Sequence, residues 1–269
     1  AEGGFRFSGG SFNDLALDKR ANDTAAEFIR SKIRETVNDP ETAEKLVPRD
    51  HPFGSKRTLI DTNYFETYNR DNVELVDIRH APIEEITATG IKTEDGEYDV
   101  DIIVFATGFD AMTGSFFRMD IQGRDGQRLE DTWAEGPKTY LGLSVADYPN
   151  LFMITGPGSP SVLSNMPVSI EQHVEWISDL LEYTREHDID VVEAGADEQV
   201  AWGEHVNELA SKTFYPMADS WYMGANIPGK PRVFMPYVGG VGTYREKCDE
   251  IAAAGYEGYK LEKSKVASD

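Results

Sequence analysis

The stretch Ile102-Ile-Val-Phe-Ala-Thr-Gly-Phe-Asp110 decides the fold class. Its first five residues are continuously apolar, a pattern typical of a strand buried on both faces of a parallel sheet. Thr107 and Gly108 follow at the carboxyl end of that strand, the edge where open parallel sheets bind ligands. Helical and strand patterns alternate along the rest of the chain. We therefore predict an α/β protein in which Thr107 and Gly108 contact a ligand.

Further strands and turns are predicted on both sides of this stretch. Asp95-Gly96 and Asp125-Gly126 are dipeptides of the kind that closes a β-hairpin. The predicted strands cover 73–78, 83–89, 151–155 and 233–238, and the third leads into Gly156-Pro-Gly-Ser-Pro160.

Apolar residues spaced three or four apart predict helices towards both ends of the chain. Residues 1–51 are expected to be helical, with one helix over 23–37 between an N-cap at Asp23 and a stop at Pro40. Other helices are predicted over 41–47, 197–213 and 243–254, and after a capping box at Ser169-Ile-Glu-Gln172. The expected buried faces are Ala25, Ile29, Ile33 and Val37 in the first helix, and Ile170, Val174, Ile177 and Leu181 in the last.

The composition narrows the possible partners. Acidic side chains outnumber basic ones by 48 to 26, a formal net charge of -22, which disfavours binding to nucleic acid or to an anionic membrane surface. The acidic run 193–198 is expected to form a solvated face. The single cysteine, Cys248, cannot form an internal disulfide, so we expect an unreactive thiol in a cytoplasmic protein.

Membrane, targeting and metal signals are also not expected. The sequence predicts neither a signal peptide nor a membrane span, and Ala1 in place of Met indicates a processed or truncated start. The five histidines lack metal-ligand spacing, so no metal site is predicted.

Several short motifs follow one another in a specific order. They are Phe53-Gly-Ser-Lys-Arg57, Tyr68-Asn-Arg-Asp-Asn-Val73, Val104-Phe-Ala-Thr-Gly-Phe-Asp110, Thr139-Tyr-Leu-Gly142, Gly156-Pro-Gly-Ser-Pro160, Ser169-Ile-Glu-Gln-His-Val-Glu-Trp176, Ser220-Trp221 and Gly224-Ala-Asn-Ile-Pro-Gly-Lys230. Ala-Thr-Gly alone is common among flavoproteins, whereas the ordered set is specific. From Gly4 to about Leu261 the chain resembles the carboxy-terminal half of flavin-dependent Baeyer–Villiger monooxygenases of the phenylacetone and cyclohexanone monooxygenase type.

The resemblance implies two dinucleotide-binding domains with doubly wound sheets, and a helical insertion. Residues 1–51 would end the helical insertion, residues 52–109 the NADP-binding domain and residues 110–269 the FAD-binding domain. The family's Gly-x-Gly-x-x-Gly loops and its Phe-x-Gly-x-x-x-His motif do not occur in this sequence. We therefore expect the missing amino-terminal half, in the same or a second chain, to complete the site, and this chain alone to be inactive.

The resemblance also assigns roles around the Lys-Arg pair. Arg57 is implied to be catalytic, stabilising an anionic flavin peroxide and the intermediate formed on attack, because a guanidinium stays protonated when partly buried. Lys56 is implied to bind the 2′-phosphate of NADPH, and Ser55 that phosphate or its ribose. Without the resemblance, an isolated Lys-Arg pair is more often a solvated surface charge.

Two later segments are implied to contact cofactor and substrate. Trp221 would reach the nicotinamide cofactor from a Gly- and Pro-rich loop that moves, although an isolated Trp is more often a core residue. The segment 155–166 would run beside the flavin, with Met166 in contact, although a plain strand-to-helix connection is the alternative. The residues implied to border the ketone pocket are Val162, Leu163 and Ser164.

The implied reaction uses NADPH, FAD and O2 to insert one oxygen atom into a ketone, giving an ester or a lactone. Two alternatives stay open. One is a related flavin monooxygenase that oxidises nitrogen or sulfur, although the Lys56-Arg57 context favours ketones. The other is a non-catalytic fragment that binds a partner chain through unpaired sheet edges.

Overall fold

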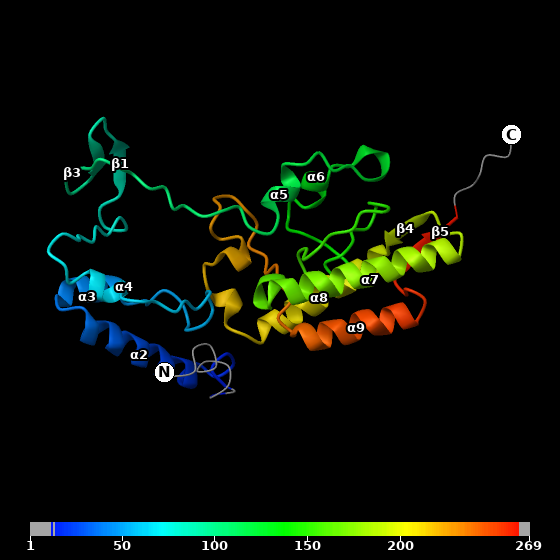
Figure 1. Cartoon of the computed structure of the whole chain (residues 1–269), viewed down its shortest axis with the longest axis horizontal. Helices are drawn as coiled ribbons and strands as arrows, with labels where there is room; N and C mark the ends of the chain where they lie inside the picture. The colour runs from blue at the N-terminus through cyan, green and yellow to red at the C-terminus, as the bar shows by residue number, and fades with distance from the viewer. Residues whose placement is uncertain (1–11, 13, 264–269) are drawn as a thin grey trace. The chain divides into compact units, whose positions relative to one another are not determined.

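The computed structural model describes residue 12 and residues 14–263. The chain divides into two compact units, Ala1–Phe109 and Asp110–Asp269, and each is described by itself (Figure 1). Within the described residues the sheets are small and antiparallel, one with the strand order β1-β2-β3 and one with β4-β5. The chain is therefore an α/β protein, but the parallel sheet predicted from the sequence is not formed among these residues.

The first unit begins with helices and ends with a three-stranded sheet. Its elements are α2 (Lys19–Thr36), α3 (Pro40–Leu46), α4 (Tyr64–Thr67), β1 (Ile83–Ile86), β2 (Gly90–Thr93) and β3 (Glu97–Asp99). β2 pairs with both β1 and β3, so the hairpin predicted at Asp95-Gly96 is confirmed. The expected helical start lies outside the described residues for 1–11 and 13.

Helix α2 is longer than predicted because its N-cap is Asp18 rather than Asp23. The Asp18 carboxylate accepts hydrogen bonds from the amides of Arg20 and Ala21, which are among the donors that a helix leaves unpaired at its start. Pro40 opens α3 instead of stopping α2, since proline lacks only an amide that the first helical turn would leave free.

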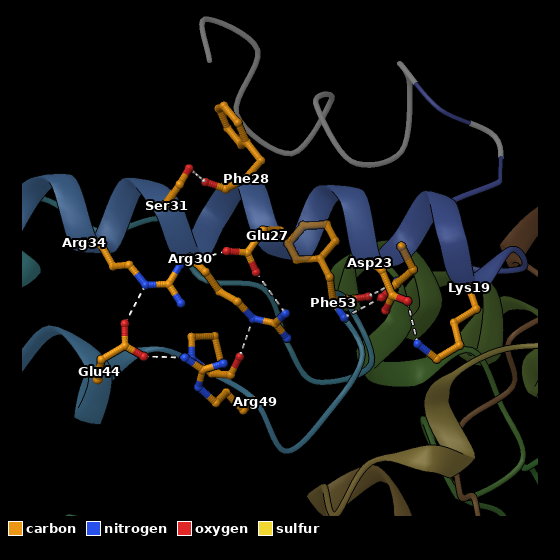
Figure 2. A network of polar contacts seen from close by, with 12 residues as sticks. Lys19, Asp23, Glu27, Phe28, Arg30, Ser31, Arg34, Glu44, Arg49 and Phe53 are labelled. Atoms are coloured by element: carbon orange, nitrogen blue, oxygen red, sulfur yellow. Dashed lines mark hydrogen bonds and ion pairs between the residues drawn. The ribbon is translucent and has the colours of Figure 1, made fainter.

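A small apolar core joins α2 to α3. Ile33 and Val37, both predicted on the buried face, pack with Ala43 and Val47. At the surface, Arg34 lies 2.6 Å from a Glu44 oxygen and 2.8 Å from a Glu27 oxygen (Figure 2). The helical pair is thus held mainly by apolar packing, because exposed ion pairs contribute less than about 1 kcal/mol each.

Two of the predicted strands in the first unit are wrong. Residues 73–78 form no strand, and residues 102–106 form an extended segment outside any sheet. Ile102 and Val104 in that segment are 79% and 80% exposed. An apolar run becomes a buried strand only where neighbouring strands pair with its amides and carbonyls, and no described residues supply such neighbours.

The second unit is mostly helical. Its elements are α5 (Gly114–Phe117), η1 (Arg124–Gly126), α6 (Leu129–Thr132), η2 (Ser161–Leu163), α7 (Met166–Glu186), β4 (Val191–Ala194), α8 (Ala196–Ser211), η3 (Tyr215–Met217), η4 (Trp221–Met223), α9 (Val241–Ala253) and β5 (Tyr259–Glu262). The helices predicted over 197–213 and 243–254 are confirmed as α8 and α9. The turn predicted at Asp125-Gly126 is present, and an isolated antiparallel bridge between Gln122 and Arg128 spans it.

The main core of this unit is rich in aromatic side chains and is formed by residues of α7, α8 and α9, of which α7 and α9 pack against each other (Figure 1). The Trp176 indole of α7 donates a 2.9 Å hydrogen bond to the carbonyl of Cys248 in α9. Trp202 of α8 stacks on Tyr237, with ring centroids 5.4 Å apart. Cys248 is buried, which raises the pKa of its thiol to about 12 and keeps it unreactive near neutral pH.

Helix α7 buries a different face from the one predicted. Ile170, Val174 and Leu181 are exposed, and only Ile177 of the predicted stripe is buried. The helix also begins at Met166, so Ser169 lies inside it and does not cap it. Its buried face mixes polar, aromatic and aliphatic side chains, namely Ser169, Gln172, His173, Trp176, Ile177, Leu180 and Thr184. Hydrophobic periodicity alone therefore predicts the wrong buried face for α7.

Three further predictions in the second unit are corrected. Residues 151–155 and 233–238 form no strands, since their amides bond to loops, as in the bond from Met153 N to Leu143 O. The run 193–198 is not wholly solvated: Glu193 is buried in β4, with Arg124 at 2.6 Å and Lys260 at 3.4 Å. These two cations offset the cost of burying the carboxylate.

The described part of the chain contains neither a membrane-crossing helix nor a metal-binding cluster. No helix there is both long enough and apolar enough to cross a membrane. Likewise, residues 14–263 contain no group of three or more His, Cys, Asp or Glu side chains placed to hold a metal ion.

Candidate functional site

The Phe53-Gly-Ser-Lys-Arg57 segment is held in place by a buried asparagine of α2. Asn22 Nδ2 donates to the Phe53 carbonyl at 2.8 Å, and Asn22 Oδ1 accepts from the Phe53 amide at 2.9 Å. Nearby, Arg30 Nε donates to the Pro48 carbonyl at 2.9 Å (Figure 2). The segment is thus fixed to α2 at its first residue. Sequence analysis missed Asn22, because the predicted helix began one residue after it.

Ser55 stabilises the turn that follows Phe53. It is buried, and its hydroxyl donates a 2.6 Å hydrogen bond to the Pro52 carbonyl. Gly54 has a φ of 79°, a conformation that favours glycine. The Ser55 proton is therefore engaged within the turn.

The turn presents Lys56 and Arg57 together. Both line a small pocket of about 100 Å³ in the first unit, with His51 and Phe53 among its other walls. Lys56 Nζ lies 3.3 Å from Asp50, whose pKa is lowered chiefly by a hydrogen bond from His51. Arg57 is exposed and makes no hydrogen bond or ion pair with the described residues. The arrangement offers an anionic ligand two cations: Arg57, which has no partner among the described residues, and Lys56, which is weakly paired.

Thr107 and Gly108 lie at the end of the exposed segment 102–109. Both are exposed, and Gly108 has a φ of 82°. A Cβ atom added at Gly108 would meet nothing within 4 Å. Their place after an apolar run is as predicted, but the sheet edge on which that prediction depends is not formed by the described residues.

The 155–166 loop of the second unit is held by hydrogen bonds to several elements. The Thr155 amide donates to Nδ1 of His173 on α7 at 2.9 Å, and the Gly158 amide donates to the Met235 carbonyl at 2.6 Å. A Cβ atom at Gly156 would lie 2.5 Å from the Gly142 carbonyl oxygen, so the chain passes here too closely for any side chain. The loop is a constrained structure rather than a loose connection.

His173 is the residue of this region that sequence analysis overlooked. Its side chain is fully buried, which lowers its pKa to about 4 and leaves it neutral near pH 7. The neutral ring accepts the Thr155 amide through Nδ1, so its proton is on Nε2, which has no hydrogen-bond partner among the described residues. His173 belongs to the Ser169–Trp176 motif, but its chemistry was considered only for metal binding.

Val162, Leu163 and Ser164 lie in or next to the 3-10 turn of the loop. Val162 and Leu163 are half-buried against the main core. The Ser164 hydroxyl contacts the Ser161 carbonyl at 2.8 Å and the Ser169 hydroxyl at 2.6 Å. Ser161 itself has a φ of 33° and a buried hydroxyl without a partner among the described residues. Strained backbone and unpaired polar atoms of this kind gather at functional sites.

Met166 lies close to this turn in sequence, and Trp221 packs against the same core cluster as the turn. Met166 is the first residue of α7, two residues after Ser164. Trp221 is half-buried, and it packs against the same core cluster as Val162 and Leu163. The structure therefore gathers the second-unit candidates around one core and the Lys56-Arg57 candidates on one turn of the first unit.

A larger pocket of about 360 Å³ lies behind the 155–166 loop, and sequence analysis did not predict it. Pro157 and Gly158 form one wall, Trp202 of α8 another and Met235 a third. The Trp202 indole donates to the Gly158 carbonyl at 3.0 Å. This bond couples the loop to α8, whereas the Gly158–Met235 bond couples it to the segment that follows Trp221.

Comparison with known proteins identifies the family. No family model matches the chain. A Baeyer-Villiger monooxygenase of Pseudooceanicola batsensis is 47% identical over 255 residues, covering 94% of this chain and 46% of the relative. Phenazine N-monooxygenase PhzNO1 of Lysobacter antibioticus is 45% identical over 259 residues, covering 96% of this chain and 47% of the relative.

Solved structures agree with this assignment. The crystal structure of OTEMO in complex with FAD and NADP matches with a TM-score of 0.89 and 45% sequence identity, covering 93% of this chain and 46% of that one. The chain spans about half the length of the curated relatives that it matches, and it corresponds to their carboxy-terminal half. The chain therefore belongs to the Baeyer–Villiger monooxygenase family.

Proposed function

We propose that this chain supplies the carboxy-terminal half of a monooxygenase that inserts one oxygen atom from O2 into a ketone, with FAD and NADPH as cofactors. The observation that carries the proposal is Arg57, an exposed guanidinium without a partner among the described residues, on a turn that Asn22 fixes to α2. The relatives support it, since one is a Baeyer-Villiger monooxygenase and a similar solved structure contains FAD and NADP.

The domain assignment is part of the proposal. Residues 1–51 end a helical insertion, residues 52–109 end the NADP-binding domain and residues 110–269 end the FAD-binding domain, with doubly wound sheets in both domains. The division of the chain after Phe109 supports the last boundary. The exposed apolar segment 102–106 supports the sheets, because its composition suits a strand whose neighbours lie in the other half of the enzyme.

The residues present fit part of each cofactor. Lys56 binds the 2′-phosphate of NADPH, and the Ser55 oxygen accepts a hydrogen bond from its ribose. The close backbone of the 155–166 loop and the unpaired Ser161 hydroxyl suit a planar ring beside Met166. The sequence contains no Gly-x-Gly-x-x-Gly loop for a pyrophosphate, so the partner half supplies that site.

The remaining candidates complete the pocket. Thr107 and Gly108 contact cofactor at the end of the apolar segment, and Trp221 contacts the nicotinamide ring. The residues that border the ketone are Val162, Leu163 and Ser164. When bound, FAD supplies the activation of O2 that no side chain can perform. Arg57 stabilises negative charge on oxygen during the reaction, where a fixed cation contributes most.

Oxidation of nitrogen is a second candidate function, because phenazine N-monooxygenase PhzNO1 is 45% identical to this chain. Sulfur oxidation and a non-catalytic role with a partner chain are the other outcomes to test. An unreactive fragment would bind its partner through the segment 102–106.

The decisive experiment joins this chain to the amino-terminal half of the Pseudooceanicola batsensis relative. We expect the chimaera to show a flavin absorbance band. Ketones should stimulate its NADPH oxidation more than sulfides or aromatic nitrogen heterocycles do. R57A should lower ester formation by about a hundredfold or more. R20A is the matched control, because Arg20 is an exposed arginine on α2. A coloured chimaera that prefers nitrogen or sulfur substrates would replace the ketone proposal, and one that oxidises no substrate would leave only the partner-binding role.

A further inference from the structure

A buried ion pair fastens one end of the loop that carries Trp221, defined here as residues 220–230. Lys230 Nζ lies 2.5 Å from Asp110 Oδ1 and 2.9 Å from the carbonyl oxygen of Ala111. The Lys230 side chain is only 8% exposed, and that of Asp110 is 30% exposed. Removing either charge would therefore leave its partner in a poorly solvated site, unlike a pair at the surface.

Two glycines make room for this pair. A Cβ atom at Gly114 would lie 2.6 Å from the Asp110 side chain. Gly224 has a φ of 71°, and a Cβ atom there would lie 3.2 Å from Lys230 Cγ. Both partners are thus packed against backbone that no other residue type could provide without displacing them.

The other end of the Trp221 loop is fastened separately. Tyr222 is buried in the main core, and its carbonyl accepts a 2.9 Å hydrogen bond from the Met235 amide. Between the two fastened ends, residues 226, 228 and 229 are exposed. The position of Trp221 therefore depends on two anchors, one apolar and one ionic.

We propose that Lys230 and Asp110 are positioning residues for the cofactor-binding loop. Their ion pair holds the end of the Trp221 loop to the residue that closes the Ala106-Thr-Gly-Phe-Asp110 motif, two positions after Gly108. The effect of this ion pair on cofactor binding rests on the proposed function, in which the loop presents Trp221 to the nicotinamide ring. Loss of the pair weakens NADPH binding without removing any group that touches the reacting atoms.

The first test measures the loop itself and needs no activity. In hydrogen exchange of the full chain, K230M and D110N should each speed exchange of residues 220–230 by about tenfold or more, because breaking a buried pair destabilises what it holds. Amides of α8 and β4 should keep their wild-type rates. K212M is the matched control, since Lys212 forms an exposed pair with Glu208 at 2.6 Å, and it should change nothing.

Wild-type exchange in folded K230M or D110N would overturn the proposal. If K230M does not fold, D110N decides alone, because it keeps the shape of the aspartate. The exchanged pair D110K/K230D should recover much of the lost protection, and no recovery would mean that the ion pair is not the cause.

The second test measures the consequence in the chimaera described above. K230M should raise the KM for NADPH by about tenfold and lower kcat much less, with the flavin band unchanged. An unchanged KM alongside a loosened loop would overturn the role in NADPH binding. If the unmutated chimaera fails to oxidise NADPH, the proposed function fails, while hydrogen exchange still decides whether the pair holds the loop.

Discussion

Strand β4 and the segment 102–106 are two short apolar stretches with opposite surroundings. In β4, Val192 and Ala194 are 5% and 0% exposed although a glutamate lies between them. In the other segment, Ile102 and Val104 are 79% and 80% exposed although all five residues of 102–106 are apolar. The two stretches differ in strand pairing: β4 pairs with β5, whereas no described residues pair with 102–106.

The comparison shows that apolar composition alone does not decide burial. Pairing is needed but is not sufficient, since β1 pairs with β2 and its four residues are nevertheless exposed. An unpaired strand leaves its amides and carbonyls to water, so hydrophobicity alone cannot bury it. It follows that 102–106 is the part of the chain whose environment should change most when the other half of the enzyme is present. The predictions below test this difference between partnered and unpartnered groups.

The largest effect is expected from introducing a charge into each stretch. V192D places a carboxylate in the second unit's core and should cost about 4 kcal/mol of unfolding free energy, enough to unfold much of the unit. V104D should change the stability of the chain alone by less than about 0.5 kcal/mol. Urea unfolding followed by circular dichroism measures both.

The same pair of variants sharpens the comparison in the chimaera. There V104D should become strongly destabilising, because the segment would then be a buried strand. Equal stability of V104D and wild type in the chimaera would show that 102–106 stays exposed, and would contradict the proposed sheets.

The next effect concerns His173, whose only hydrogen bond among the described residues is the one from the Thr155 amide. Its pKa is about 4 in the folded chain and near 6.5 unfolded, so the unfolded state binds the proton more tightly. Stability is therefore full above pH 6.5 and falls by about 3 kcal/mol as the pH drops to 4. Unfolding followed by tryptophan fluorescence reports this, since all four tryptophans lie in the second unit.

H173N is the control for this pH dependence. The asparagine oxygen can accept a hydrogen bond from the Thr155 amide, but the side chain does not titrate. The variant should therefore be less stable than wild type at pH 7, and its free energy of unfolding should change less between pH 6.5 and 4.5. A wild-type slope in H173N would assign the pH dependence to another group.

The sequence predicts regular helices well and isolated polar groups poorly. Helices α8 and α9 were predicted within a few residues, because periodicity marks them independently of distant contacts. The pairing of β4 with β5 was missed, since Val191 opposes Glu262 across a long stretch of chain and neither segment alternates clearly. Residues 151–155 and 233–238 were taken as strands because apolar runs look alike whether they pack as strands or as irregular chain.

The candidate site divides in the same way. Ser55, Lys56 and Arg57 were found because they belong to a motif, and a motif can be recognised in the sequence without knowledge of packing. Asn22 lies in no motif, and His173 lies in a motif that assigned it no role, so neither residue was found. Such residues become visible only once the backbone groups that they satisfy are seen.

A smaller effect is expected from N22A, which removes the partner that the Phe53 backbone has in α2. The variant leaves the amide and carbonyl of Phe53 unpaired, a cost of about 2 kcal/mol. Hydrogen exchange should show the loss locally, as faster exchange over residues 53–57, with the second unit unchanged. N69A is the matched control: Asn69 also bonds backbone groups, at Thr36 and Asn38, but away from this turn. If residues 53–57 are equally protected from hydrogen exchange in N22A and wild type, Asn22 does not hold the turn that carries Arg57.

The smallest effect is expected from E193Q, which keeps the shape of the side chain in β4 and removes its charge. Arg124 and Lys260 are each about half exposed, at 45% and 51%, so water replaces much of what they lose. We expect E193Q to lower the free energy of unfolding by about 1 kcal/mol at low salt. The difference from wild type should be smaller at high salt, because salt screens part of the attraction that wild type gains from its charged Glu193. Urea unfolding at low and high salt measures both terms. A cost several times larger would mean that the charges of Arg124 and Lys260, rather than pairing with β5, keep β4 buried, and the contrast with 102–106 would then be one of electrostatics.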